Sequence, residues 1–112
     1  MDQMKQYQSL IKEALQEYAA FLNLGPKPYQ VVVAFDDERQ QYILRKLGWT
    51  TNRRIRQTVL HLSIHDDKIW IEEDWTEDGI ATYLLTHGVP PQEIVLAFQP
   101  PESRGELIVL AA

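Results

Sequence analysis

The fold is decided by residues 59–71, whose sequence is VLHLSIHDDKIWI. Leu60, Leu62 and Ile64 alternate with a more mixed set of residues, and this period of two is typical of a strand with one face in the core. Asp66-Asp67 predicts a tight turn, because aspartate tolerates left-handed backbone geometry and bonds its own main chain. Residues 68–74 then return as a second strand, so the stretch predicts an antiparallel hairpin.

The turn also predicts the register of this hairpin, because facing residues of an antiparallel pair lie on the same side of the sheet. The expected core pairs are Ile64 with Ile69 and Leu62 with Ile71. The expected pairs on the opposite, mixed face are Ser63 with Trp70 and His61 with Glu72. This mixed face is the first candidate for a functional surface.

A helix is predicted at the start of the chain. Apolar residues recur at three- and four-residue spacing from Met4 to Leu22, which is typical of an amphipathic helix. The helix should end near residues 23–28, because Gly25 suits a left-handed cap and the prolines at 26 and 28 cannot continue helical hydrogen bonding.

A second helix is predicted from about Glu77 to His87. Asp74 or Thr76 can accept hydrogen bonds from its first free amides, and Gly88 followed by two prolines ends it.

The remaining apolar runs predict the rest of the sheet. Residues 29–35 are rich in valine, residues 42–49 follow a polar break, and residues 94–98 form a buried run. Residues 106–110 read as a last edge strand or a packed tail. We therefore expect an α+β fold in a single domain over residues 1–112: an N-terminal amphipathic helix, a mainly antiparallel sheet of four to six strands, and a second helix before a late strand.

Charge and composition limit the functional classes. The formal net charge is −5, which argues against a chain that coats nucleic acid by bulk electrostatics. Cysteine is absent, the first residues carry no apolar signal core, and no apolar run is long enough to span a bilayer, so we expect a cytoplasmic protein without membrane contact.

The charges are unevenly distributed along the chain. Six cations and no acid lie between Arg39 and Arg56, whereas residues 66–78 contain seven acids and the single cation Lys68. If the two segments are neighbouring strands, the opposite charges could simply pair across the sheet; otherwise they form separate charged surfaces.

No constellation for catalysis, cofactor binding or metal binding is recognisable. His61 and His65 lie on a predicted strand, where four residues span about 13 Å and two imidazoles cannot share one ion unaided. A histidine that faces Glu72 is expected to form a surface pair. The serines lie in no glycine-bounded elbow, and the glycines form no phosphate-binding series.

Trp49 close to Arg53, Arg54 and Arg56 combines a stacking ring with cations. Exposed aromatic residues and arginines dominate the energies of protein interfaces, but the same residues could contact phosphates and bases of DNA. Trp70 on the mixed face reads either as a contact residue or as ordinary core.

Taken together in order and spacing, several stretches resemble the XisI family, the excision-controlling factors of the fdxN element in cyanobacteria. The matching stretches are Gly48-Trp49 with Arg53-Arg54, residues 59–64, residues 68–71 with Asp74, Thr76-Glu77, residues 79–81, residues 88–90 and residues 94–98. Two positions depart from the family pattern: Asp67 replaces the glycine of an Asp-Gly turn, and Trp75 replaces a glycine before Thr76-Glu77.

The resemblance implies a role beside an XisH-like protein in helping a site-specific recombinase excise a DNA element, and it implies no catalytic residue. We therefore expect a non-enzymatic accessory factor without cofactor. Its expected partners are an XisH-like protein, a recombinase–DNA complex and a second copy of itself. The alternatives are a regulator or antitoxin-like partner of an XisH-like nuclease-fold protein, and a weak DNA-binding protein. The expected contact residues are Trp49, Arg53, Arg54, Arg56, His61, Trp70 and Glu72.

Overall fold

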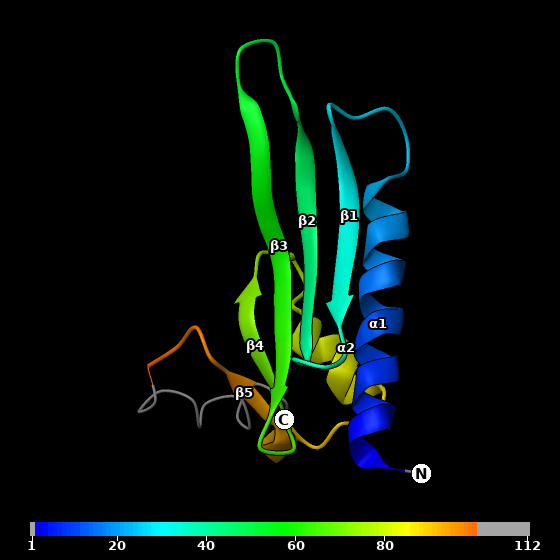
Figure 1. Ribbon diagram of the computed structural model, residues 1–112, viewed down its shortest axis with the longest axis vertical. Coiled ribbons are helices and arrows are strands. Elements are labelled where there is room, and N and C mark those ends of the chain that lie inside the picture. Colours follow the sequence, from blue (N-terminus) through cyan, green and yellow to red (C-terminus); the bar gives the residue numbers. More distant parts are fainter. Residues whose placement is uncertain (1, 101–112) are drawn as a thin grey trace.

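A computed structural model describes residues 2–100 and confirms the predicted α+β architecture (Figure 1). The elements are α1 (Gln3–Leu22), β1 (Tyr29–Asp36), β2 (Gln41–Trp49), β3 (Arg54–His65), β4 (Lys68–Asp74), α2 (Ile80–Thr86), the 3-10 helix η1 (Pro91–Glu93) and β5 (Ile94–Leu96). The strand predicted at residues 106–110 lies outside the described residues. No helix among residues 2–100 is both long and apolar enough to cross a membrane.

The described strands form one sheet in the order β1-β2-β3-β4-β5. The first four strands are antiparallel neighbours joined by short turns, whereas β5 lies parallel to β4. A parallel neighbour needs a crossover connection, and α2 with η1 supplies it.

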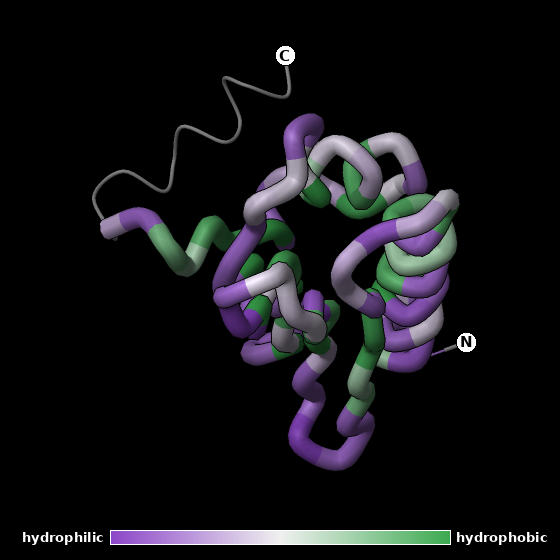
Figure 2. Tube along the Cα trace, turned by 90° about the horizontal axis from the view of Figure 1, so that it is seen from above, coloured by the Kyte–Doolittle hydropathy of each residue, from purple (hydrophilic) through white to green (hydrophobic). Residues whose placement is uncertain are grey.

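Both helices cover the same face of the sheet. Ile11 and Leu15 of α1 and Leu84 of α2 are fully buried, and they belong to one core with alternating residues of the strands such as Leu60 and Ile71. Figure 2 shows hydrophobic and hydrophilic residues interleaved along α1, the helix beside the N-terminus, which is the amphipathic pattern that the spacing predicts. The opposite face of the sheet therefore carries no helix from residues 2–100.

The hairpin of β3 and β4 confirms three of the four predicted residue pairs. Ile64 pairs with Ile69, Leu62 with Ile71 and Ser63 with Trp70. Asp66 and Asp67 have φ of 55° and 62°, a left-handed turn that two aspartates tolerate. Asp67 therefore fills the position of the expected glycine without changing the hairpin.

The predicted pairing of His61 with Glu72 is wrong. The register shifts between His61 and Leu62, and His61 pairs with Glu73 instead. Glu72 is the extra residue of a β-bulge, which leaves it out of the ladder. Its carboxylate accepts a hydrogen bond from the hydroxyl of buried Ser63 at 2.9 Å.

The helix ends differ slightly from prediction. α1 ends at Leu22, and the side-chain amide of Asn23 then both donates to the carbonyl of Val31 and accepts from its N–H, which anchors the helix end to β1. The predicted start of α2 near Glu77 is three residues too early, because residues 75–79 form a loop and Gly79 with φ of 83° precedes the helix.

The late strand is shorter than predicted, since β5 ends at Leu96 and residues 97–99 turn away. β5 is therefore an edge strand of only three residues.

Candidate interaction surface

The hairpin of β2 and β3 extends past the ends of β4 and β5, with β1 beside it as far as Gly48, as the upper half of Figure 1 shows. β3 has 12 residues, but β4 pairs only with its second half, from Leu60 to His65. Residues 54–58 therefore pair with β2 alone. Four of the seven predicted contact residues lie on this protruding hairpin, which is called the hairpin tip below and comprises residues 45–58.

Side-chain alternation distributes the cations of the hairpin tip over two faces. A second register shift, between Leu44 and Arg45, precedes the tip. Beyond it the facing pairs are Arg45 with Thr58, Leu47 with Arg56 and Trp49 with Arg54. Because facing residues share a side, the arginines at 45, 54 and 56 lie on the outer face together with Trp49.

Trp49 and Arg54 form an exposed pair on the outer face. The indole of Trp49 is 62% exposed, and the Arg54 guanidinium carbon lies 5.6 Å from the centroid of its ring. Arg54 also donates a hydrogen bond to the carbonyl of Gly48 at 3.2 Å. This cation–π contact orients a large ring in solvent and contributes little to stability at such an exposed site.

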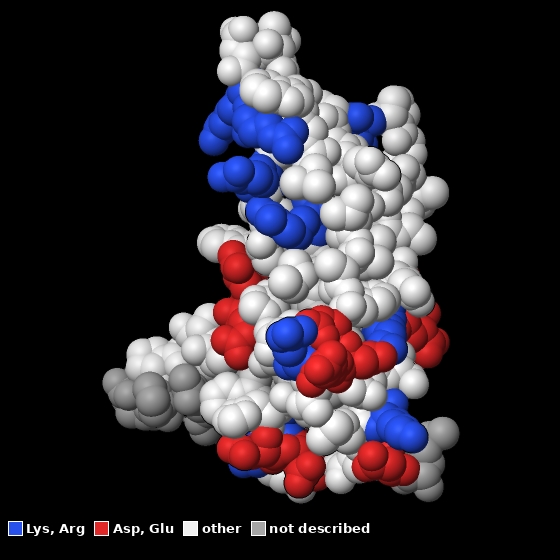
Figure 3. Space-filling view, in the orientation of Figure 1, with Lys and Arg blue, Asp and Glu red and all other residues white. Residues whose placement is uncertain are grey.

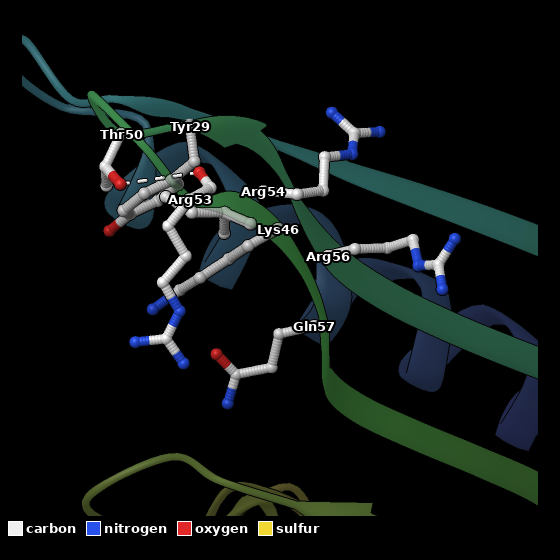
Figure 4. Close-up of a pocket in the computed structure, with 8 residues that line it drawn as sticks. Tyr29, Lys46, Thr50, Arg53, Arg54, Arg56 and Gln57 are labelled. Atoms are coloured by element: carbon white, nitrogen blue, oxygen red, sulfur yellow. Dashed lines mark hydrogen bonds between the residues drawn. The ribbon is translucent and has the colours of Figure 1, made fainter.

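The other face of the hairpin tip is a cationic groove. Figure 4 shows Lys46, Arg53 and Gln57 pointing to one side of the strands, while Arg54 and Arg56 point to the other. The groove has a volume of about 610 Å³. Its floor includes Tyr29, whose ring lies 4.8 Å from the Lys46 ammonium nitrogen. The Arg53 side chain therefore points away from those of Arg54 and Arg56, although all three residues contribute to the lining of the groove.

No ion pair among residues 2–100 joins the basic segment to the acidic segment. The alternative in which these charges pair across the sheet is wrong, because the cationic half of β3 faces β2 and not β4. On the face shown in Figure 3, the upper end at the hairpin tip carries Lys and Arg without Asp or Glu, whereas the other half of the molecule carries acids together with further Lys and Arg. The chain is therefore electrostatically polar despite its modest net charge.

The other three predicted contact residues lie lower on the outer face. His61 Nε2 lies 2.7 Å from the side-chain oxygen of Gln41, so the histidine pairs with β2 rather than with Glu72. Trp70 is half-buried, and its indole N–H donates to the carbonyl of His65 at 2.9 Å. Five strand positions, roughly 16 Å, separate Arg56 from His61, so the structure does not unite all seven residues in one site.

Two features of the surface escaped the sequence prediction. Lys46 belongs to the groove, and the alternation of residues 41–49 already indicated that it would lie opposite Arg45. A second pocket of about 250 Å³ lies beside the groove and includes Tyr18, Phe21 and Trp75. Trp75 is 67% exposed. The sequence could have indicated this pocket, because Trp75 replaces the glycine that usually precedes Thr76 in the family pattern.

Metal-ligating side chains do not converge in the part of the chain that the structure describes. Residues 2–100 contain no group of three or more His, Cys, Asp or Glu side chains placed to hold a metal ion. The buried hydroxyl of Ser63 donates to the Glu72 carboxylate, and the imidazole of His61 bonds Gln41 instead.

The fold and the surface thus define a class: a small α+β domain whose helices cover one face of an antiparallel sheet and whose cationic hairpin projects into solvent. The family model described as "XisI protein" matches residues 1–107, and the chain belongs to the XisI family. No curated protein matches its sequence.

Two solved structures from Anabaena variabilis ATCC 29413 are similar to this chain. One is of a XisI-like protein, with 34% sequence identity and a TM-score of 0.85, covering 91% of this chain and 93% of that one. The other is of the fdxN element excision controlling factor XisI, with 34% identity and a TM-score of 0.81, covering 93% and 94%.

Proposed function

We propose that this chain is a non-enzymatic accessory factor that controls excision of a DNA element by site-specific recombination, and that it acts in the cytoplasm by binding an XisH-like partner protein. Two observations support the proposal. The chain belongs to the XisI family, and a relative of known structure is named as the fdxN element excision controlling factor.

The exposed Trp49–Arg54 pair is the observation that carries the binding role. A tryptophan that is 62% exposed on a protruding hairpin contributes little to the core. Tryptophan and arginine are also the residues most enriched among those that dominate binding energies. Their contact holds both side chains in place before binding, which reduces the entropy lost when a partner docks.

The proposal is tested by co-purifying the chain with its XisH-like companion. The double substitution Trp49→Ala and Arg54→Ala should reduce the yield of complex at least about tenfold, since each interface anchor typically contributes more than 1 kcal/mol. A matched control, Phe98→Ala with Lys68→Ala, removes one exposed ring and one exposed cation far from the hairpin tip. An unchanged yield for the first variant, or equal losses for both, contradicts the proposed surface.

Direct DNA contact is a second candidate, which the gathering of cations at the hairpin tip favours (Figure 3). Arg53, Arg54 and Arg56 would contact phosphates, and such contacts weaken steeply as salt is added because counterions are released. A binding isotherm on duplex DNA at several salt concentrations decides the matter. Binding that is absent at low salt excludes this role for the isolated chain.

A regulatory or antitoxin-like role toward a nuclease-fold companion would depend on the same complex of this chain with its XisH-like companion. It predicts that adding this chain changes the cleavage activity of the companion. An excision factor without that role would leave cleavage of DNA by the isolated companion unaltered.

A further inference from the structure

Among residues 2–100, no strand pairs with one edge of the first half of β3. The sheet order places β2 on one side of β3, while β4 reaches only as far as Leu60 on the other. At Val59 the edge is closed, because its carbonyl accepts the N–H of Trp75 at 2.9 Å. One side of the backbone at residues 54–58 therefore has no strand partner within the described part of the chain.

The orientation of the backbone groups identifies which residues face this edge. Thr50 donates its N–H to the carbonyl of Arg53 at 2.8 Å, and Trp49 donates away from β3 to Pro28 at 3.2 Å. The backbone carbonyl of Arg53 thus points toward β2. Because backbone groups alternate in direction along a strand, the N–H and C=O of Arg54 point away from β2. The N–H and C=O groups of the residues at 54, 56 and 58 consequently point outward, as on any edge strand.

The charged side chains around this edge determine which charge an added strand must carry. Arg54 and Arg56 flank it on the outer face, and Lys46 and Arg53 line the groove on the other face. An added strand would place alternate side chains on these two faces. Acidic side chains on that strand would meet a cation on either side, whereas basic ones would be repelled.

The closed end of the edge offers an apolar contact. Trp75, Tyr18 and Phe21 line the pocket of about 250 Å³ that begins where Val59 pairs with Trp75. Trp75 and Phe21 are each 67% exposed. An apolar residue at the end of an added strand would cover both rings.

We infer that the open edge of β3 receives an extended acidic segment of the partner protein as an additional antiparallel or parallel strand, anchored by one apolar residue beside Trp75. This inference rests on the proposed function and specifies the form of the partner's contact. Main-chain hydrogen bonds supply affinity in this mode of recognition, and the flanking side chains supply specificity. Charged side chains and bulges also protect natural edge strands against unwanted pairing. The experiment must therefore distinguish an edge that binds a strand from an edge whose charges prevent binding.

The substitution Arg56→Pro separates backbone pairing from charge. Proline removes the outward N–H but is tolerated at an edge where that N–H makes no ladder bond. Arg56→Ala, the matched control, removes the same charge and keeps the N–H. The probe is a short fluorescein-labelled peptide of glutamates that ends in one valine, and binding is followed by fluorescence anisotropy.

Strand addition predicts that Arg56→Ala weakens peptide binding a few-fold, as for an exposed charge pair, and that Arg56→Pro weakens it by at least a further factor of about ten. Equal effects of the two substitutions, or no binding of the peptide to the unaltered chain, overturn the inference. Tighter binding of single-stranded DNA than of the peptide, with a steep salt dependence, also overturns it.

Two N-methylated peptides keep the inference testable if Arg56→Pro does not fold. Each carries methyl groups on alternate backbone nitrogens, in complementary positions. A strand that pairs along one edge uses alternate N–H groups, so one peptide should lose binding and the other should retain it. Equal binding of both contradicts strand addition. Loss of the companion complex on substituting Trp49 and Arg54, tested separately, addresses the proposed function itself.

Discussion

The Asp74 carboxylate accepts the backbone N–H of Ile80 at 2.7 Å. The last residue of β4 thereby caps the first turn of α2 across a five-residue loop. The other carboxylate oxygen accepts the N–H of Thr76 at 2.8 Å, and the Thr76 hydroxyl accepts the N–H of Gly79. One aspartate therefore orders the whole connection between sheet and helix.

Substitution Asp74→Ala should lower the free energy of unfolding by about 1–2 kcal/mol, the usual loss for a helix cap. Urea denaturation followed by circular dichroism measures the change. Glu77→Ala in the same loop removes an exposed carboxylate that makes no such bond, and it should change stability by less than about 0.5 kcal/mol. Equal effects would show that Asp74 acts only through its charge.

Gly48 should not accept a side chain. A Cβ built there would lie 2.2 Å from the carbonyl oxygen of Pro28 and 2.6 Å from the Cα of Tyr29, both of them backbone atoms. Gly48→Ala must separate β1 from β2, so we expect a loss of about 1–3 kcal/mol in the free energy of unfolding. Thr51→Ala at the exposed turn nearby is the control and should leave thermal unfolding unchanged.

Acid should weaken the contact between α1 and the turn after β1. The Lys12 ammonium group and the Tyr42 hydroxyl both bond Asp37, at 2.6 and 2.8 Å, and they hold the pKa of that carboxyl below its usual value. A lowered pKa in the folded state adds stability above the unfolded value of about 3.9, and that stability is lost as the pH falls through the folded pKa.

Thermal unfolding measured from pH 7 down to about pH 3 tests this linkage. Asp37→Asn should flatten the acid limb of the profile most, and Lys12→Met should flatten it in part, because the Tyr42 hydroxyl still bonds the ionised carboxylate when Lys12 is removed. A limb that stays as steep in both variants would assign the acid sensitivity to other carboxylates.

The three tryptophans should differ in their access to solvent. Trp49 and Trp75 are 62% and 67% exposed, whereas Trp70 is half-buried and donates to His65. Acrylamide quenching should therefore fall on Trp49→Phe or Trp75→Phe and rise, per remaining tryptophan, on Trp70→Phe. Binding of the companion should protect Trp49; unprotected Trp49 in a purified complex would place the interface elsewhere.

The sequence predicted the fold well where periodicity and turn chemistry agree. The Asp66-Asp67 turn and the alternation around it gave the register of Leu62 and Ile64 correctly, because a shift of one residue would have exposed the core face. The N-terminal helix was predicted within one or two residues for the same reason. Residues 4–22 carry an unbroken apolar stripe.

Bulges were the features that the sequence did not predict. The pairing of His61 was wrong because Glu72 adds one residue to β4, and a similar shift after Leu44 determines which arginines share a face. An extra residue in a strand costs little and leaves no mark in the apolar pattern when it falls on the solvent side. The candidate site was therefore predicted in composition but not in geometry.

The parallel pairing of β5 has a consequence for the order in which the chain folds. Strands β1 to β4 join their neighbours through short turns, so they can assemble as soon as residues up to 74 have left the ribosome. Ile94 and Leu96 must instead wait for the crossover before they reach Ile69 and Ile71. Until then the β4 edge of the nascent sheet is unpaired by β5, and Ile69 and Ile71 lack the cover that Ile94 and Leu96 give them.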